Sequence, residues 1–149
     1  GGGSPTTVPT LVPTPVGGST IDAVSIFTYE GNWNTEPIIR IYGPIDDPII
    51  SNLTTGDVLD FSQYVLGSVT GISILTGEWI EIDCRQNTIV DQDGVNRISW
   101  LSEDSDLASF HIAMEPEAPG NVNALRVQGD NVGAVTHIDV TYYRRYLGV

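Results

Sequence analysis

Apolar and polar residues alternate along most of this chain with a period of two, the repeat of a strand that buries one face. The run EWIEIDC, residues 78–84, has the clearest pattern: Ile80, Ile82 and Cys84 share one face, and a tryptophan and two acidic residues share the other. This segment is therefore predicted to be a half-buried strand.

The same alternation recurs in other runs, and turn-forming residues separate them. The strand-like runs are IIRIY (38–42), FHIAM (110–114) and VTHIDVTYY (135–143), with Phe110, Ile112 and Met114 inward in the second. The run NTIVDQDGVNRISWL (87–101) is predicted to be a hairpin that turns at Asp93–Gly94. In the segment 38–57, Pro37 and Pro48 are predicted to begin strands, where no ladder donor is needed.

Many short strands joined by Gly and Pro turns favour an antiparallel β-sandwich. We expect an all-β domain of about nine or ten strands over residues 20–149. No stretch predicts a long helix.

The first nineteen residues, GGGSPTTVPTLVPTPVGGS, have a different composition and hold four of the nine prolines of the chain. Proline favours extended polyproline conformation, and the flanking glycines are flexible. Residues 1–19 are therefore predicted to be a linker or extended arm, which tethers the domain to something upstream or reaches along a neighbour's surface.

The charge excludes some classes of partner. Six basic residues face nineteen acidic ones, for a net charge of −13. Nucleic acid is not expected, because phosphate binding requires a basic surface. Anionic membrane surfaces are disfavoured for the same reason, and no run has the length of a membrane span. The single cysteine, Cys84, is predicted to be a buried apolar residue, because it has no partner for an internal disulfide.

No catalytic motif is present, so we expect no enzyme activity and no cofactor. The two histidines, His111 and His137, are predicted to lie on solvated strand faces, too few for a zinc site. The acidic turns Asp91–Asp93 and Asp104–Asp106 could offer oxygen ligands to calcium, but tight turns use the same residues. We therefore expect no metal, although calcium at these two turns stays open. The sequon at Asn52 is interpreted as a turn.

The aromatic residues give one candidate site. Trp79 falls on the polar face of its strand beside Glu81 and Asp83, where an exposed indole with acidic hydrogen-bonding partners could hold a sugar ring. Trp33, in the loop GNWNTEP, is a second candidate for this glycan platform. The competing interpretation is that another sheet or a subunit covers Trp79. Trp100 has the parity of Ile98 and is predicted to be core.

Two long segments, residues 30–61 and 77–127, carry an ordered series of motifs. In the first, a loop with Thr-x-Pro leads into an alternating strand, a Gly-Pro bend, a Pro-x-Ile-x-Asn strand and a Thr-Gly turn. These positions are Gly31, Thr35, Pro37, Ile39, Ile41, Gly43, Pro44, Pro48, Ile50, Asn52, Thr55 and Gly56. The second series consists of Ile80, Ile82, Asp83, Asn96, Arg97, Asp104, Ser105, Phe110, Pro119, Gly120 and Asn123.

In order and spacing these motifs resemble siphophage tail proteins of the distal-tail type, over nearly all of residues 28–149. The resemblance implies the C-terminal galectin-like, or jelly-roll, β-sandwich of that family, which projects from a ring at the tail tip. In some members it is thought to contact host-surface saccharides. The resemblance carries over no catalytic residue. Where the family has an N-terminal ring-forming domain, this chain has the Pro/Thr segment.

The expected function is therefore that of a virion structural protein, in the tail or decorating the particle, assembled in the host cytoplasm. Its expected partners are other virion proteins, in a symmetric homo-oligomer or ring, and host-surface polysaccharide. The alternative is a carbohydrate-binding module that the linker tethers to a catalytic domain. A small hydrolase is the least favoured hypothesis, because no nucleophile or metal set is recognisable.

Overall fold

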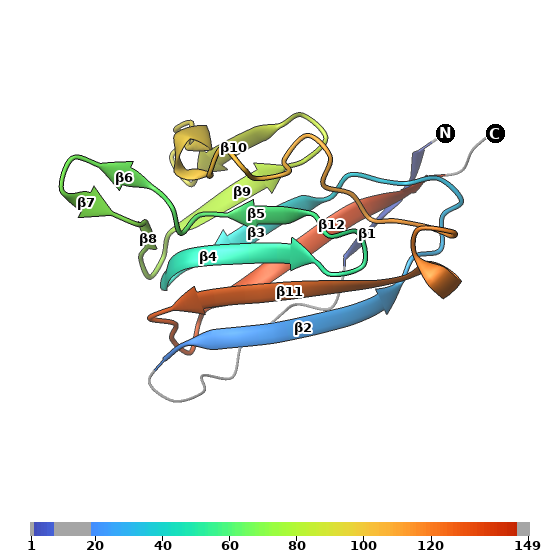
Figure 1. Cartoon of the computed structure of the whole chain (residues 1–149), viewed down its shortest axis with the longest axis horizontal. Helices are drawn as coiled ribbons and strands as arrows, with labels where there is room; N and C mark the ends of the chain where they lie inside the picture. Colours follow the sequence, from blue (N-terminus) through green and yellow to red (C-terminus); the bar gives the residue numbers. More distant parts are fainter. Residues whose placement is uncertain (1, 8–18, 146–149) are drawn as a thin grey trace.

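Two antiparallel sheets packed face to face make up the computed structural model, which describes residues 2–7 and 19–145 (Figure 1). One sheet has the strand order β1-β12-β3-β9-β10, and the other has the order β2-β11-β4-β5, with β8 also paired to β4. The strands are β1 (Gly2–Thr7), β2 (Ile21–Thr28), β3 (Ile38–Tyr42), β4 (Ile45–Asn52), β5 (Val58–Asp60), β6 (Val65–Leu66), β7 (Val69–Thr70), β8 (Ser73–Ile74), β9 (Trp79–Asp83), β10 (Thr88–Asp91), β11 (Val122–Asp130) and β12 (His137–Arg145).

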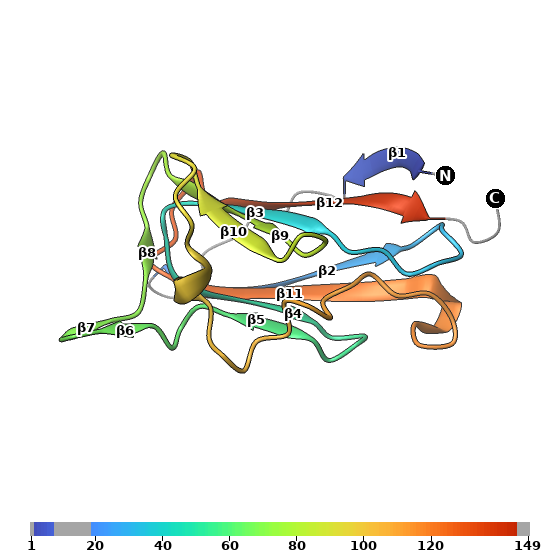
Figure 2. The same cartoon turned by 90° about the horizontal axis from the view of Figure 1, so that it is seen from above.

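The prediction of an all-β antiparallel sandwich is confirmed. Every pair of named strands is antiparallel, and the two layers are seen edge-on in Figure 2. Of the twelve strands in the described residues, β6, β7 and β8 have only two residues each. The described part of residues 20–149, to which the prediction of about nine or ten strands applies, contains eleven of the twelve, eight of them longer than two residues.

The core lies between the sheets and follows the predicted alternation. In β9, Ile80 and Ile82 are buried between half-exposed neighbours, and Cys84 directly after the strand is buried as predicted. Burial raises the pKa of the Cys84 thiol, which keeps it protonated. The largest fully buried side chains are Tyr29, Phe61, Phe110, Ile39, Ile41, Ile45, Ile50, Leu59, Ile80, Ile82, Ile89 and Ile112.

Part of the segment predicted as a linker or extended arm forms a strand. Gly2–Thr7 forms β1, which pairs antiparallel with the C-terminal half of β12 at the edge of its sheet. An edge strand accepts Pro5, because one side of the strand needs no ladder donor. Residues 8–18, the rest of the Pro/Thr-rich stretch, lie outside the described residues.

Three local predictions need correction. Residues Ile98–Trp100 form a 3₁₀ helix, so alternation does not apply there; Ile98 is exposed, and Trp100 is only partly buried against the core. The FHIAM segment is a loop with a single bridge at Ile112, although its apolar residues do face inward. Pro48 lies inside β4 rather than at its start, next to Asp47, whose φ of 50° marks an irregularity in the strand.

A small hairpin projects from the sandwich. Strands β6 and β7 pair only with each other and extend away from both sheets (Figure 2). The Gly71 N–H donates to the Tyr64 carbonyl at 2.7 Å and closes the base of the hairpin. Val65, Leu66 and Val69 are exposed on it. Both helices in the described residues are single 3₁₀ turns, so that part of the chain holds no helix of the length and apolarity that a bilayer crossing requires.

Candidate functional site

Two chain connections meet at one end of the sandwich, on the right in Figure 1. One is residues 29–37, between β2 and β3, and the other is residues 110–121, before β11. Thr35 and Ile112 form a two-way bridge, with N···O distances of 3.2 and 2.7 Å. The Tyr29 hydroxyl donates to the Trp33 carbonyl at 2.6 Å. The two connections are therefore held in fixed positions relative to each other.

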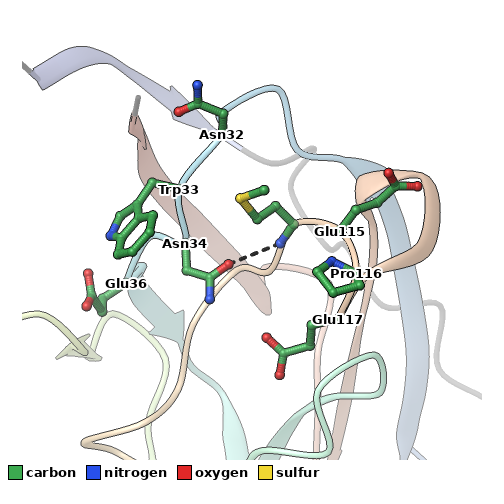
Figure 3. A pocket seen from close by; sticks show the side chains of 8 residues that line it. Asn32, Trp33, Asn34, Glu36, Glu115, Pro116 and Glu117 are labelled. Carbon is green, nitrogen blue, oxygen red and sulfur yellow. Dashed lines mark hydrogen bonds between the residues drawn. The ribbon is translucent and has the colours of Figure 1, made fainter. Parts of the chain in front are cut away.

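A groove of about 400 Å³ lies between these connections (Figure 3). We call it the Trp33 groove. The residues that line it are Asn32, Trp33, Asn34, Glu36, Met114, Glu115, Pro116 and Glu117. Trp33 is 46% exposed, so much of its indole is open to a ligand. An open aromatic ring beside a few polar side chains is the usual composition of a small-ligand site.

Internal hydrogen bonds hold the polar side of the Trp33 groove. The Asn34 side-chain oxygen accepts from the Met114 N–H at 3.2 Å, the dashed contact in Figure 3. The Glu115 carboxylate accepts from the Gly120 N–H at 2.8 Å, and the Glu115 N–H donates to the Asn121 side chain at 2.8 Å. These bonds fix one wall of the groove, so its shape is largely formed before any ligand binds.

His111 contacts Glu117, which lines this wall of the groove. The prediction that His111 lies on a solvated strand face is wrong, because His111 is half-buried and lies in a loop. Its Nε2 lies 2.7 Å from the Glu117 carboxylate and its Nδ1 lies 2.6 Å from the Ser109 carbonyl. Both contacts are to oxygen atoms, so a ring with a proton on each nitrogen donates to both. Burial of the ring opposes the charge, but the bonds to Ser109 and Glu117 outweigh it and raise the pKa of His111.

Asp57 completes a group of three titratable residues. Its Oδ2 lies 3.4 Å from His111 Nδ1 and is buried without a hydrogen-bond partner among the described residues. Burial raises the pKa of Asp57; the His111 charge opposes this rise, and the carboxylates of Asp106 and Glu117 add to it. The pKa values of Asp57 and His111 are thus both raised, which favours the protonated form of each side chain.

The residues of the glycan platform predicted on β9 contact other residues of the chain. Trp79 is half-buried, and the Arg40 guanidinium of β3 lies 3.8 Å from the centre of its ring. Glu81 forms an ion pair with the same Arg40 at 2.8 Å. Asp83 accepts hydrogen bonds from the N–H groups of Arg85 and Gln86, which form the β9–β10 turn. All three residues thus already have partners in the described chain.

The structure separates Trp33 from the other three candidates. Trp33 lies in the connection before β3, and neither Trp79, Glu81 nor Asp83 lines its groove. His137, in contrast, lies on a strand face as predicted and stacks on Tyr42, with ring centres 4.0 Å apart. The outer face of this sheet is therefore covered by contacts between its own side chains.

The two acidic turns that could offer ligands to calcium hold backbone groups of the fold instead. Asp91 is buried, accepts from the N–H groups of Asp93 and Val95, and pairs with Arg97 at 2.8 Å. Asp106 accepts from the Val58 N–H at 2.9 Å. In the residues that the structure describes, no group of three or more His, Cys, Asp or Glu side chains is arranged to hold a metal ion.

Two buried asparagines hold the loop that carries the groove. The Asn123 side chain binds both the N–H and the carbonyl of Ala113, each at 2.9 Å. Asn52 donates to the His111 carbonyl at 2.9 Å and accepts from the Thr54 N–H at 3.0 Å. The turn predicted at this sequon follows directly after Asn52, which is the last residue of β4 and bonds the turn through its side chain. Asn52 is fully buried, so the folded chain does not offer its sequon for glycosylation.

Sequence reasoning missed most of the Trp33 groove. Of its lining, only Trp33 was a candidate, whereas Glu115 and Glu117 were not. The available signal was the segment MEPEAPG, residues 114–120, in which two glutamates and two prolines follow an apolar run. Such a segment predicts an acidic, turn-rich loop, but it does not indicate that the loop lies against Trp33.

Comparison of the chain with family models, curated proteins and solved structures finds no match.

Proposed function

We propose that this chain is a non-enzymatic structural domain of a phage particle, in the tail or on the particle surface. In this proposal it assembles with other virion proteins and contacts host-surface saccharide through the Trp33 groove. The virion assignment is supported by the ordered motif resemblance over residues 28–149. The β-sandwich fold agrees with what that resemblance implies, although a fold alone does not establish a function.

The observation that carries the saccharide contact is the exposed indole of Trp33 beside amide and carboxylate groups. A sugar ring has an apolar C–H face that packs on an aromatic ring, and hydroxyl groups at its edge that need hydrogen-bond partners. Trp33 offers the apolar surface, and Asn32 and Glu36 line the same groove. Trp33 is favoured over Trp79, because Arg40 lies on the ring of Trp79.

The charge of the groove restricts the class of saccharide. Glu36, Glu115 and Glu117 line it, and the described residues of its lining include no Lys or Arg. An acidic groove in a chain of net charge −13 repels uronic and sialic acids and phosphorylated polymers. Neutral and amino sugars are therefore the expected ligands.

Titration calorimetry with neutral, amino-bearing and anionic oligosaccharides tests the saccharide contact. We expect binding of neutral or amino sugars, weakened at least about tenfold by Trp33→Ala. Trp79→Ala is the matched control and is expected to keep the affinity, because its ring is already occupied by Arg40. Equal affinity in Trp33→Ala, or preference for anionic sugars, would contradict the assignment of the groove.

Immunogold labelling or cryo-electron microscopy of the source particles tests the virion assignment. Density in a ring at the tail tip would support the distal-tail interpretation. Density repeated along the tail tube or on the head would support a decoration protein. Absence of the chain from every particle would overturn the virion assignment.

One alternative is favoured by the same groove together with the Pro/Thr composition of segment 1–19, of which Gly2–Thr7 forms β1. In it, the domain is a carbohydrate-binding module tethered to a catalytic domain. Saccharide binding that depends on Trp33, in a chain absent from particles, would select this alternative.

A further inference from the structure

Other segments of the chain cover some of the outer edge strands of the two sheets but not all of them. At β5, the Val58 carbonyl accepts from the Asp106 N–H at 2.8 Å, and the Val58 N–H donates to the Asp106 side chain. At β10, the Ile89 carbonyl accepts from the Arg97 N–H at 2.8 Å. Both edges are thus covered by following segments of the same chain. Covering an edge in this way prevents another strand from pairing there.

The edge at β2 has no such cover in the described residues. Strand β2 pairs with β11 on one side, in an unbroken register from Ile21 to Thr28. The next bond of this ladder runs from the Tyr29 N–H to the Asn121 carbonyl at 2.8 Å. Bonded and non-bonded pairs alternate in an antiparallel ladder, so the odd-numbered residues of β2 bond to β11. The N–H and carbonyl groups of Asp22, Val24, Ile26 and Thr28 therefore point to the outer edge.

Strand β2 also lacks the features that usually protect an edge. It has eight residues with no proline, no lysine and no irregularity in its register. Its outer face exposes Val24 at 47% and Ile26 at 69%. The one charged residue, Asp22, is paired with Arg126 of β11 at 2.6 Å. A long, regular and apolar edge of this kind is a template for another strand.

We infer that β2 is a homodimer interface, at which β2 of a second copy pairs antiparallel about a two-fold axis at Ser25. A two-fold axis makes a strand pair with itself, so the register must be self-complementary. Only even-numbered residues offer bonds at this edge, and these must therefore lie opposite even-numbered residues of the partner. With Ser25 opposite itself, Val24 lies opposite Ile26 of the partner subunit, which meets this condition.

This register also has the best side-chain pairing. Val24 and Ile26 of both copies form one continuous apolar strip across the interface, and β-branched pairs of this kind stabilise a sheet. Asp22 lies opposite Thr28 of the partner subunit, so no like charges face each other. The two Asp22 residues are then separated by six positions along the strand, or about 20 Å. The inference depends neither on the saccharide contact nor on the virion assignment.

Static light scattering with size-exclusion chromatography of the full chain tests the dimer. We expect a dimer whose population increases with protein concentration. The Ile26→Pro variant is expected to raise the dissociation constant of this dimer about tenfold or more, because proline removes an outward-pointing N–H from each copy. Ile26→Val is the matched control and is expected to keep the dimer. Circular dichroism checks that Ile26→Pro retains the sandwich, as an edge strand allows.

Cysteine cross-linking tests the register independently of the proline variant. In the inferred dimer, Ser25 pairs with itself at a non-hydrogen-bonded position, where Cα atoms lie about 4.5 Å apart and a disulfide fits. Oxidation of Ser25→Cys is expected to give a covalent dimer. Thr28→Cys is the control and is expected not to cross-link, because Thr28 lies opposite Asp22. The native Cys84 is buried and gives no background.

Several results would overturn the inference. A chain that stays monomeric at all concentrations and does not cross-link through Ser25→Cys would show that β2 does not pair with itself. A folded Ile26→Pro variant with an unchanged dimer would place the interface elsewhere. Equal cross-linking of Ser25→Cys and Thr28→Cys would rule out the register. None of these results bears on saccharide binding by the Trp33 groove, so the two proposals fail separately.

Discussion

Both ring nitrogens of His111 face oxygen atoms that only accept hydrogen bonds, the Ser109 carbonyl and the Glu117 carboxylate. Alternation along the sequence correctly places His111 opposite Phe110 and Ile112, but it does not show what covers that side. The covering groups are Asp57, from the turn after β4, and Glu117, from the groove loop. Their approach to the ring depends on how two loops pack, which no local pattern encodes.

The stability of the fold should decrease above neutral pH because of His111. Its pKa is raised in the folded state, so the stabilisation is fully present below the unfolded value of about 6.5 and is lost as pH rises through the folded value. One group binds at most one proton more in the folded state, so the slope is at most about 1.4 kcal/mol per pH unit, and solvent screening of the partly exposed pair lowers it further. Denaturant unfolding between about pH 6 and pH 8 measures it.

Two variants decide whether His111 causes this slope. His111→Gln is expected to flatten the dependence of unfolding free energy on pH over that range. His137→Gln changes the other histidine, which stacks on Tyr42 at the sheet surface, and is expected to keep the slope. An unchanged slope in His111→Gln would assign the effect to another group.

Strands and connections differ in how far the sequence predicts them. In β3, β9 and β12 the period-two pattern identifies the buried face, because the sheet geometry forces successive side chains to opposite sides. The same pattern fails at Ile98–Trp100, where the chain turns into a 3₁₀ helix after the bridge at Asn96. Short apolar runs fit several conformations, and only the packing around them selects one.

The loop that carries the groove should depend on Asn123. Asn123→Ala removes both bonds to Ala113 and leaves a buried N–H and a buried carbonyl without partners, which is expected to cost about 2–4 kcal/mol. Urea unfolding measures the loss. Asn96→Ala, which removes one exposed side chain bonded to the Ile98 N–H, is the control and should cost less than about 1 kcal/mol. A loss as small as that of the control would mean that the loop is held by other contacts.

At the scale of the whole molecule, the sequence predicts the sandwich and its acidic surface but not its edges. The strand pattern of residues 21–28 looks like that of other strands, and nothing in it marks β2 as unpaired on one side. That property appears only once the strand order is known, because β5 and β10 receive covering segments and β2 receives none from the described residues. The Trp33 groove is likewise not predicted by the sequence, because it forms between two loops that come from opposite halves of the chain.

The net charge gives a prediction for the inferred dimer. Two chains of charge −13 repel each other, and salt screens this repulsion. Because the β2 interface is apolar and its Asp22 is paired within each copy, the dimer should become tighter as the NaCl concentration increases. Sedimentation equilibrium at several salt concentrations measures this. A dimer that weakens with salt would be held by opposite charges and so by another surface.

The β6–β7 hairpin offers a place to modify the molecule without disturbing it. Its base is closed by the Gly71–Tyr64 hydrogen bond, and its tip at Gly67–Ser68 is exposed and remote from both sheets in Figure 2. A peptide tag inserted between these two residues should leave the folding, the Trp33 groove and the β2 edge unchanged. Such an internal tag would mark the position of each copy in electron micrographs while leaving both chain termini unmodified.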